Sequence, residues 1–252
     1  MQKFQDLRAL VTGGGRGIGA AIAASLTSHG AYVTVLGRNK DSLAERVASG
    51  HAATYAVADV TDQNKFESTI AEIMSNGSID ILVNNAGAAM SAPFAKTSTA
   101  DFQGMFEVNL LGAVIAIKTV LPGMRARKFG RIVNIASTAA LKGYAYVSAY
   151  VASKHALLGL TRSLALELAQ TGVTVNAVCP GFTETDMLDG TIENIVKKTG
   201  RTPEVARSEL EKSNPMGRLI SPSEVAEAVT FLASREATAI TGTTVSVSGG
   251  EI

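Results

Sequence analysis

The stretch Thr12-Gly13-Gly14-Gly15-Arg16-Gly17-Ile18-Gly19 decides how the rest of the chain is arranged. It follows a short apolar run, Arg8–Thr12, and opens a helical pattern, Ile18–His29. Glycines let the backbone turn tightly and come close to a ligand. The free N–H groups and the positive dipole end of a helix N-terminus suit a pyrophosphate. The stretch therefore indicates a dinucleotide site between a first strand and a first helix, with a tight structural turn as the alternative.

Short apolar runs alternate with helical patterns along the whole chain. The runs predict strands at Arg8–Thr12, Tyr32–Leu36, Thr54–Val57, Ile79–Val83, Arg131–Ala136, Val173–Val178 and Thr244–Val247. The patterns between them predict helices at Ile18–His29, Lys40–Ala48, Gln63–Ser75, Ala100–Arg125, Ala149–Gln170 and Ser223–Ala233. The strands are apolar on both faces, as in a parallel sheet that helices cover. The sequence thus predicts an α/β fold, a doubly wound, seven-stranded parallel sheet with helices on both faces.

The domain organisation is predicted to be simple. No linker rich in proline, glycine or serine divides the chain, so residues 1–252 are expected to form a single dinucleotide-binding and catalytic domain. One segment, Asp186–Asn214, interrupts the alternation because it is rich in charge and poor in strand formers. We interpret residues 186–214 as a helical flap inserted next to the substrate.

Composition excludes several classes of partner. The chain has 252 residues, 46% of them hydrophobic, and 23 basic against 22 acidic residues give a net charge of +1. A field that would hold nucleic acid or an anionic membrane is therefore absent. Cys179 is the one cysteine, the N-terminus has no apolar signal-peptide core, and no clean 18-residue apolar run is present. We expect a cytoplasmic protein with neither a membrane nor a nucleic acid as partner.

The end of the second predicted strand bears on which dinucleotide binds. It reads Val35-Leu36-Gly37-Arg38-Asn39, and Gly37 stands where NAD-preferring sites usually place an acid for the ribose hydroxyls. Arg38 follows it, and Arg16 lies in the glycine turn within reach of the same place. The planar donor fork of arginine matches the 2′-phosphate of NADP. The sequence favours NADP(H), with NAD possible if both arginines are merely solvated charges.

A tyrosine and a lysine form the candidate catalytic pair. Tyr150 and Lys154 lie four residues apart on a predicted helix and so share one face. A free tyrosine has a pKa of about 10 and is a poor acid–base catalyst at neutral pH. A nearby ammonium favours the phenolate and is expected to lower that pKa, which suits carbonyl–alcohol chemistry. Alone, the pattern also fits an ordinary helix with a half-buried tyrosine and a solvated lysine.

Taken together, these motifs resemble the short-chain dehydrogenase/reductase family over nearly the whole chain. Ser137 lies 13 residues before Tyr150, and Asn109 lies 41 before it. The pieces that carry the likeness are Thr12-Gly13 to Gly19, Asp59-Val60, Asn84-Asn85-Ala86-Gly87, Asn109, Ser137, Tyr150 with Lys154, and Pro180-Gly181. Their joint occurrence in this order and spacing is very improbable by chance.

The resemblance implies a cofactor role for many of these residues. Asp59 would accept a hydrogen bond from the adenine amino group beside the Val60 backbone, and the Asn84–Gly87 run would line the adenosine ribose. After Pro180-Gly181, Thr183 and Thr185 would meet the nicotinamide carboxamide or the phosphates. The implied cofactor-binding set is Thr12, Gly13, Gly15, Arg16, Gly17, Ile18, Gly19, Arg38, Asp59, Val60, Asn85, Ala86, Gly87, Tyr150, Lys154, Pro180, Gly181, Thr183 and Thr185.

The resemblance also implies the catalytic set Asn109, Ser137, Tyr150 and Lys154. Ser137 would hold the substrate oxygen, and Tyr150 would give up its proton to it. Lys154 would bond the nicotinamide ribose and lower the Tyr150 pKa, and Asn109 would kink its helix and hold a water that links Lys154 to solvent. No metal is required, and the three histidines are scattered along the chain.

Within the family, the stretches Gly130–Ser137 and Ser153–Thr185 look most like bacterial 3-oxoacyl reductases and aromatic-polyketide ketoreductases. The resemblance implies an NADP(H)-dependent oxidoreductase acting on β-keto or 3-hydroxyacyl compounds. Thr171 stands where carrier-protein reductases often have a basic residue. This departure weakens the interpretation that the substrate is bound to a carrier protein, and it leaves CoA esters or free small ketones as substrates. The alternatives are an NAD-dependent secondary or cyclic alcohol dehydrogenase and a non-catalytic dinucleotide-binding protein.

Two further expectations follow from the resemblance. The C-terminal run Val245–Gly250 and the long helices at Ala100–Arg125 and Ala149–Gln170 imply a homotetramer. The residues that should flank the substrate pocket are Ala89, Met90, Thr138, Leu141, Tyr144, Phe182, Met187 and Leu188. Most of them are apolar, as the walls of small-molecule sites generally are.

Overall fold

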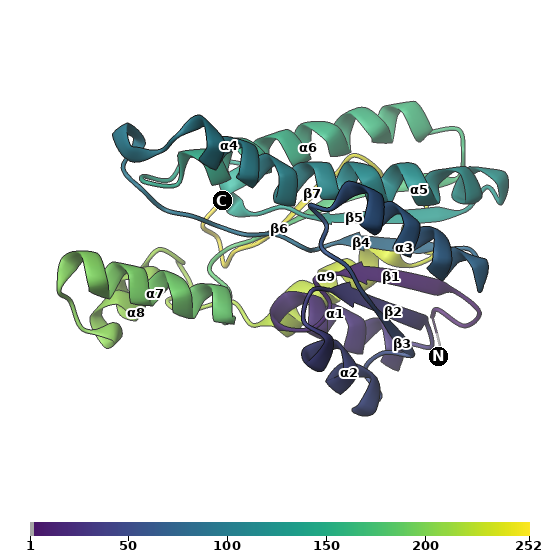
Figure 1. Ribbon diagram of the computed structural model, residues 1–252, viewed down its shortest axis with the longest axis horizontal. Helices are drawn as coiled ribbons and strands as arrows, with labels where there is room; N and C mark the ends of the chain where they lie inside the picture. The colour runs from purple at the N-terminus through teal and green to yellow at the C-terminus, as the bar shows by residue number, and fades with distance from the viewer. Residues whose placement is uncertain (1–2) are drawn as a thin grey trace.

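The computed structural model describes residues 3–252, which form one parallel sheet between two layers of helices (Figure 1). The strands are β1 (Arg8–Thr12), β2 (Tyr32–Gly37), β3 (Thr54–Val57), β4 (Ile81–Asn84), β5 (Gly130–Ile135), β6 (Val173–Pro180) and β7 (Thr244–Val247). Their order in the sheet is β3-β2-β1-β4-β5-β6-β7, and every neighbouring pair is parallel. The predicted doubly wound seven-stranded sheet is confirmed.

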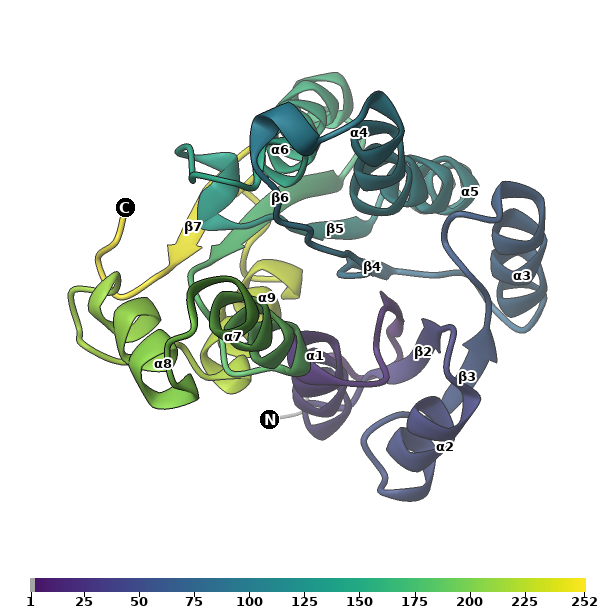
Figure 2. The ribbon, with the colours of Figure 1, turned by 60° about the vertical axis from the view of Figure 1, so that its left-hand side comes forward.

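The helices divide between the two faces of the sheet, as Figure 2 shows. One layer holds α1 (Gly17–Ser28), α2 (Lys40–Ala48) and α9 (Pro222–Ala233). The other holds α3 (Gln63–Ser75), α4 (Thr99–Phe106), α5 (Gly112–Ala126) and α6 (Ser148–Leu168). Each layer has its own apolar core, with Ile22 and Val229 fully buried on one side and Phe66 and Val120 on the other. Burial of these side chains is the main force that holds helices to sheet.

The two edge strands depart from the prediction that strands are apolar and buried on both faces. β1, β4, β5 and β6 are almost wholly buried. The residues of β3 and β7 are only partly buried, and Val57 at the end of β3 is 42% exposed. The reason is position, because each edge strand has a strand neighbour on one side only within the described chain.

The predicted helix over 100–125 is continuous from Thr99 to Ala126 but is not uniform. Residues Glu107–Leu111 form a π-turn, η2, between α4 and α5. By length and by a mean hydropathy of 1.6 in one window, this helix could cross a membrane, a test that core helices of globular proteins also pass. The expectation that no clean 18-residue apolar run is present is not contradicted, because Glu107 and Lys118 interrupt the apolar part of this helix. In the structure α5 packs on α3, β4 and β5.

The flap is confirmed as helical. It contains α7 (Asp186–Thr199) and α8 (Pro203–Lys212), which project beyond the sheet in Figure 1. Gly200, in the left-handed conformation at φ 71°, ends α7 and allows the chain to reverse. The flap has a small core of its own, formed by Leu188, Ile192, Ala206 and Leu219. Leu188 therefore packs inside the flap and does not flank a substrate pocket as expected.

The sheet order fixes where a ligand can bind. β1 and β4 are neighbours, yet the chain leaves β1 toward β2 on one side and leaves β4 toward β5 on the other. At such a switch point the loops after the two strands diverge and leave a crevice at the carboxyl ends of the strands. The glycine turn follows β1 and the Asn85–Gly87 run follows β4, so the two predicted ligand segments face each other there.

Candidate active site

The glycine turn is tight because neighbouring atoms leave no room for side chains. Gly13 and Gly17 have φ angles of 64° and 52°, a conformation that favours glycine. A Cβ atom on Gly13 would lie 2.9 Å from the side-chain nitrogen Nδ2 of Asn85, and one on Gly19 would lie 2.2 Å from the Gly13 carbonyl oxygen. The turn therefore packs directly against the loop after β4 and against the first turn of α1.

Hydrogen bonds of the buried Thr12 and of Asn85 lock this turn to the residues directly after β4. Thr12 is a buried residue, only 3% exposed. Its hydroxyl accepts hydrogen bonds from the backbone N–H groups of Asn85 and Ala86, both at 3.0 Å. The Asn85 side chain donates to the carbonyls of Thr12 and Gly13 at 3.0 and 3.1 Å. The polar atoms of Thr12 and Asn85, both predicted to bind the cofactor, thus shape the site by joining its two loops.

The first turn of α1 fits a pyrophosphate. Arg16 is the residue before the helix, and no side chain caps the helix there. The first N–H groups of α1 therefore keep their donor capacity and the positive end of the helix dipole. Thr185 lies over the turn, since its methyl group would be 3.0 Å from a Cβ on Gly17. The phosphates of a dinucleotide would be held by Gly15, Gly17 and Ile18 from below and by Thr185 from above.

The two arginines assigned to the 2′-phosphate each face a carboxylate. Arg16 donates through Nη1 to Asp186 at 3.1 Å, and Arg38 lies 3.7 Å from Asp59. Both arginine side chains are largely exposed, at 71% and 75%. Asp59 accepts two hydrogen bonds from Thr61, and these bonds, with Arg38, lower the pKa of Asp59. The rim of the site thus keeps Asp59 ionised and able to accept a further hydrogen bond.

Ser137, Tyr150 and Lys154 converge at the carboxyl end of β5. Ser137 begins the short turn η3 (Thr138–Ala140), and its Oγ accepts a hydrogen bond from the Ala139 N–H at 3.1 Å. Tyr150 and Lys154 lie in the first two turns of α6, and the Lys154 Nζ is 5.8 Å from the centre of the Tyr150 ring. Lys154 Nζ also donates to the Ile135 carbonyl at 2.9 Å.

Burial dominates the electrostatics of this group. It raises the pKa of Tyr150, while a hydrogen bond with Ser137 acts in the opposite direction. Burial lowers the pKa of Lys154 to about 8. The expectation that Lys154 lowers the Tyr150 pKa is therefore not what this structure shows. The cost of burying a phenolate sets the direction of the shift, and the group that opposes it is Ser137. At neutral pH the tyrosine is a phenol with a proton to donate.

Asn109 lies in the π-turn η2, where the helix departs from regular α-helical geometry. The side-chain amide of Asn109 accepts from the Ala88 N–H and donates to the Ala88 carbonyl, both at 3.0 Å. It also donates to the Ser153 hydroxyl at 3.1 Å. Ser153 in turn donates to the Tyr150 carbonyl at 2.7 Å. Asn109 thus joins the loop after β4 to the catalytic helix, and Ser153 is a residue whose part in the site no sequence motif revealed.

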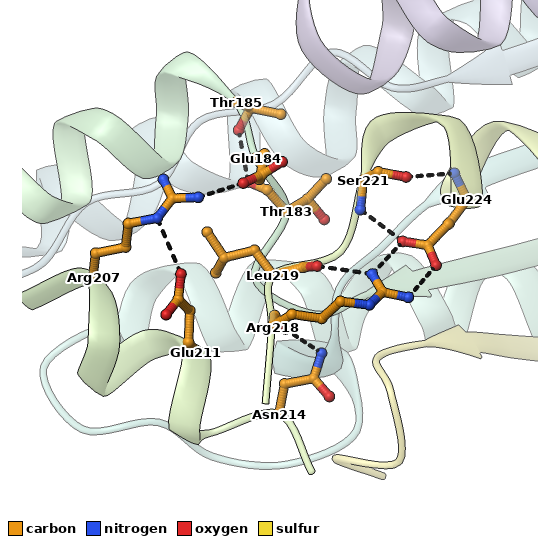
Figure 3. Close-up of polar contacts among 10 residues, drawn as sticks. All are labelled: Thr183, Glu184, Thr185, Arg207, Glu211, Asn214, Arg218, Leu219, Ser221 and Glu224. Atoms are coloured by element: carbon orange, nitrogen blue, oxygen red, sulfur yellow. Dashed lines mark hydrogen bonds and ion pairs between the residues drawn. The ribbon is translucent and has the colours of Figure 1, made fainter. Parts of the chain in front are cut away.

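The segment after β6 brings the nicotinamide-side residues into place. The Gly181 N–H donates to the Val247 carbonyl of β7 at 3.0 Å. Thr183 is buried, and its hydroxyl donates to the Gly181 carbonyl at 3.0 Å, so only its backbone is available for a ligand. The Thr185 hydroxyl donates at 3.3 Å to the Thr183 carbonyl, a contact that Figure 3 also shows.

A buried polar cluster near Ser137 was not foreseen from the sequence. The Tyr144 hydroxyl shares a hydrogen bond of 2.6 Å with the Thr138 hydroxyl and donates another to Glu251. Burial raises the pKa of Tyr144, and the hydrogen bond to Glu251 raises it further. The Glu251 side chain is 3% exposed and pairs with Lys142 at 2.9 Å. Glu251 is next to the last residue, so no local pattern could place it beside residues 138–144.

Arg127, the residue directly after α5, is held by groups just before β4. Arg127 donates to the Ile79 carbonyl and to Asp80, at 2.8 and 3.1 Å. This arginine therefore joins the end of α5 to the residues just before β4. In the described part of the chain, residues 3–252, no group of three His, Cys, Asp or Glu side chains is arranged to hold a metal.

Comparison with known proteins decides the family. A family model described as enoyl-(acyl carrier protein) reductase matches residues 13–251. The chain is 38% identical to the granaticin polyketide synthase putative ketoacyl reductase 1 of Streptomyces violaceoruber, over 96% of this chain and 92% of that one. The protein belongs to the short-chain dehydrogenase/reductase family. A second member of the family, acetoacetyl-CoA reductase of Shinella zoogloeoides, is 39% identical over 96% of this chain and 97% of its own length.

Solved structures of family members superpose over almost all residues. An actinorhodin polyketide ketoreductase crystallised with NADPH is 36% identical, with a TM-score of 0.93 over 100% of this chain and 98% of that one. Levodione reductase is 32% identical, with a TM-score of 0.92 over 98% of each chain. The chain is accordingly an NAD(P)-dependent oxidoreductase of the short-chain type that acts on keto and hydroxyl groups.

Proposed function

We propose that this short-chain reductase uses NADPH to reduce a β-keto group, of the 3-oxoacyl or polyketide type, to a hydroxyl. The observation that carries the proposal is the convergence of Ser137, Tyr150 and Lys154 at the carboxyl end of β5, with Lys154 Nζ 3.5 Å from the place of a Cβ on Gly87 in the loop after β4. The names of its relatives support the substrate class, since they include ketoacyl reductases, an acetoacetyl-CoA reductase and a polyketide ketoreductase.

The residues supply what carbonyl reduction requires. When bound, the dihydronicotinamide supplies the hydride, and negative charge then grows on the substrate oxygen. The Ser137 hydroxyl and the Tyr150 phenol donate hydrogen bonds to that oxygen, and Tyr150 transfers its proton to it. Lys154 binds the ribose and holds a positive charge near the phenolate that remains. Because burial raises the pKa of Tyr150, the phenol is protonated before the transfer.

Arg16 and Arg38 support NADP(H) as the cofactor. Both guanidinium groups stand at the rim of the crevice after β1 and β2, and Gly37 leaves the place of an NAD-selecting acid empty of charge. Asp59 binds the adenine amino group, and Asn85, Ala86 and Gly87 form the wall beside the adenosine. The other cofactor contacts are assigned to Gly13, Gly19, Val60, Pro180 and Gly181 through their backbones.

The test is reduction of short β-keto esters and β-keto thioesters, followed by loss of nicotinamide absorbance with NADPH and with NADH. We expect NADPH to be preferred, and Arg38→Asp to abolish the preference. Tyr150→Phe should lower turnover by about 10²- to 10⁴-fold with cofactor binding intact, because it removes the proton donor. Full activity in Tyr150→Phe would refute the mechanism. Oxidation of secondary alcohols with NAD⁺, in preference to reduction of β-keto compounds with NADPH, would favour the dehydrogenase alternative.

We also infer how the chain is organised in use. Residues 1–252 act as one domain in which residues 186–214 cover the substrate, and four copies assemble into a homotetramer in the cytoplasm. The family resemblance of Val245–Gly250 and of the long helices α4–α5 and α6 supports the tetramer. Sedimentation velocity on the purified protein tests it, and a monomer at micromolar concentration would contradict it.

A further inference from the structure

Helix α7 crosses from one wall of the dinucleotide crevice to the other. At its start, Asp186 accepts a hydrogen bond from Arg16 of the glycine turn at 3.1 Å. In the second half of α7, Asn194 Nδ2 donates to the Ser91 hydroxyl at 2.7 Å, and Lys198 Nζ donates to the Ser91 carbonyl at 2.9 Å. These partners are more than 100 residues apart in sequence, so the contacts join separate parts of the fold.

Ser91 lies in a loop that hydrogen bonds hold to the rest of the protein. It lies in the loop after β4, which begins with the Asn85–Gly87 run and is held at Ala88 by Asn109. One residue after Ser91, the Ala92 N–H donates to the Tyr146 carbonyl at 2.8 Å, just before the helix that carries Tyr150. A bond to Ser91 therefore ties α7 to the catalytic side of the site.

The root of the flap is braced separately, as Figure 3 shows. Arg207 of α8 pairs with Glu184 and with Glu211, and Arg218 pairs with Glu224 at the start of α9. Thr183 forms a parallel bridge with Ile220. Beyond this root, α7 packs chiefly on α8. The far part of α7 is thus fixed to the body of the protein through Ser91.

We propose that Ser91, Asn194 and Lys198 are positioning residues that fasten the flap across the crevice and set how fast the dinucleotide leaves. The proposal rests on the cofactor site proposed above. A dinucleotide lying between the glycine turn and the loop after β4 is covered by α7, which is fixed at Arg16 and at Ser91. Its departure requires the Ser91 bonds to break, whereas its phosphate and ribose contacts involve other residues.

The test is the dissociation rate of NADPH, measured by stopped-flow fluorescence when the complex is chased with excess NADP⁺. Asn194→Ala and Lys198→Met should each release NADPH about fivefold faster, the effect of losing one charged or neutral hydrogen bond at a partly exposed site. Two matched controls should leave the rate unchanged. Lys197→Met removes the same charge from the neighbouring position, and Glu209→Gln breaks the Arg201–Glu209 pair within the flap at 2.7 Å.

A second readout does not need the cofactor. Thermolysin should cut the flap several-fold faster in Asn194→Ala and Lys198→Met than in the controls, with thermal midpoints equal to wild type. Wild-type release and wild-type cleavage in both Asn194→Ala and Lys198→Met would overturn the proposal while leaving the proposed function intact. Failure of the wild-type protein to bind either NADPH or NADH would overturn the proposed function. It would also overturn the proposal that Ser91, Asn194 and Lys198 retain a dinucleotide.

Discussion

The glycine turn and the flap both contribute to the crevice, but they are held by different kinds of interaction. The turn is fixed by hydrogen bonds of Asn85 and of Thr12, which is 3% exposed, and by close backbone packing at Gly13 and Gly19. The flap is fixed by ion pairs and hydrogen bonds at its exposed edges and by a small core of its own. Buried bonds are costly to break and exposed pairs are not, so the turn is a preformed wall and the flap is the part that can move.

The largest expected effect contrasts two helical glycines. Gly19→Ala places a Cβ 2.2 Å from the Gly13 carbonyl oxygen, and Gly190→Ala in α7 meets nothing within 4 Å. We expect Gly19→Ala to lower the free energy of unfolding by about 3 kcal/mol or more through overpacking. Gly190→Ala should raise it by about 0.5–1 kcal/mol, because alanine favours a helix. Urea denaturation measures both, and equal effects would erase the distinction between turn and flap.

Removing the Thr12 hydroxyl probes the buried bonds directly. Thr12→Val keeps the shape but leaves the N–H groups of Asn85 and Ala86 without their acceptor. The expected loss is about 2–3 kcal/mol in the free energy of unfolding, with weaker cofactor binding as well. Thr12→Ser retains the hydroxyl and serves as the control. A Thr12→Val protein as stable as Thr12→Ser would show that the loop after β4 holds its position without this bond.

Lys154 gives a dependence on pH that the exposed flap pairs do not. Its folded-state pKa of about 8 lies below the ordinary 10.5, so the unfolded chain binds more protons between these values and the protein gains stability as pH rises through them. Relative to Lys154→Met, the wild-type free energy of unfolding should rise on the order of 2 kcal/mol from pH 8 to pH 10. Chemical denaturation at several pH values measures the difference, and a constant difference would contradict the depressed pKa.

The smallest effect is expected at the root of the flap. Glu184→Gln removes the exposed pair with Arg207, whose side chains are 51% and 42% exposed. The expected loss of stability is below about 1 kcal/mol and should shrink further in high salt. Thermal unfolding in low and high salt measures it. A loss of several kcal/mol that salt does not change would mean that the flap is as firmly built as the turn.

The sequence determined the fold, and it predicted which residues form the candidate site. Alternation of apolar runs and helical patterns placed seven strands to within about two residues of their observed ends, because periodicity follows backbone geometry locally. Three helix boundaries were also closely predicted, at Lys40–Ala48, Gln63–Ser75 and near Pro222–Ala233. The spacing of Tyr150 and Lys154 predicted the catalytic pair, and the family resemblance added Ser137 to it.

Only the tertiary structure decided how those residues act on one another. It paired Arg16 with Asp186, joined Asn109 to Ser153, brought Glu251 to Tyr144 and fastened α7 to Ser91. It also reversed the expected direction of the Tyr150 pKa, since the cost of burying a charge depends on all the atoms packed around it. Spacing along a chain specifies which side chains share a helix face, whereas burial and long-range contacts arise only when distant segments pack together.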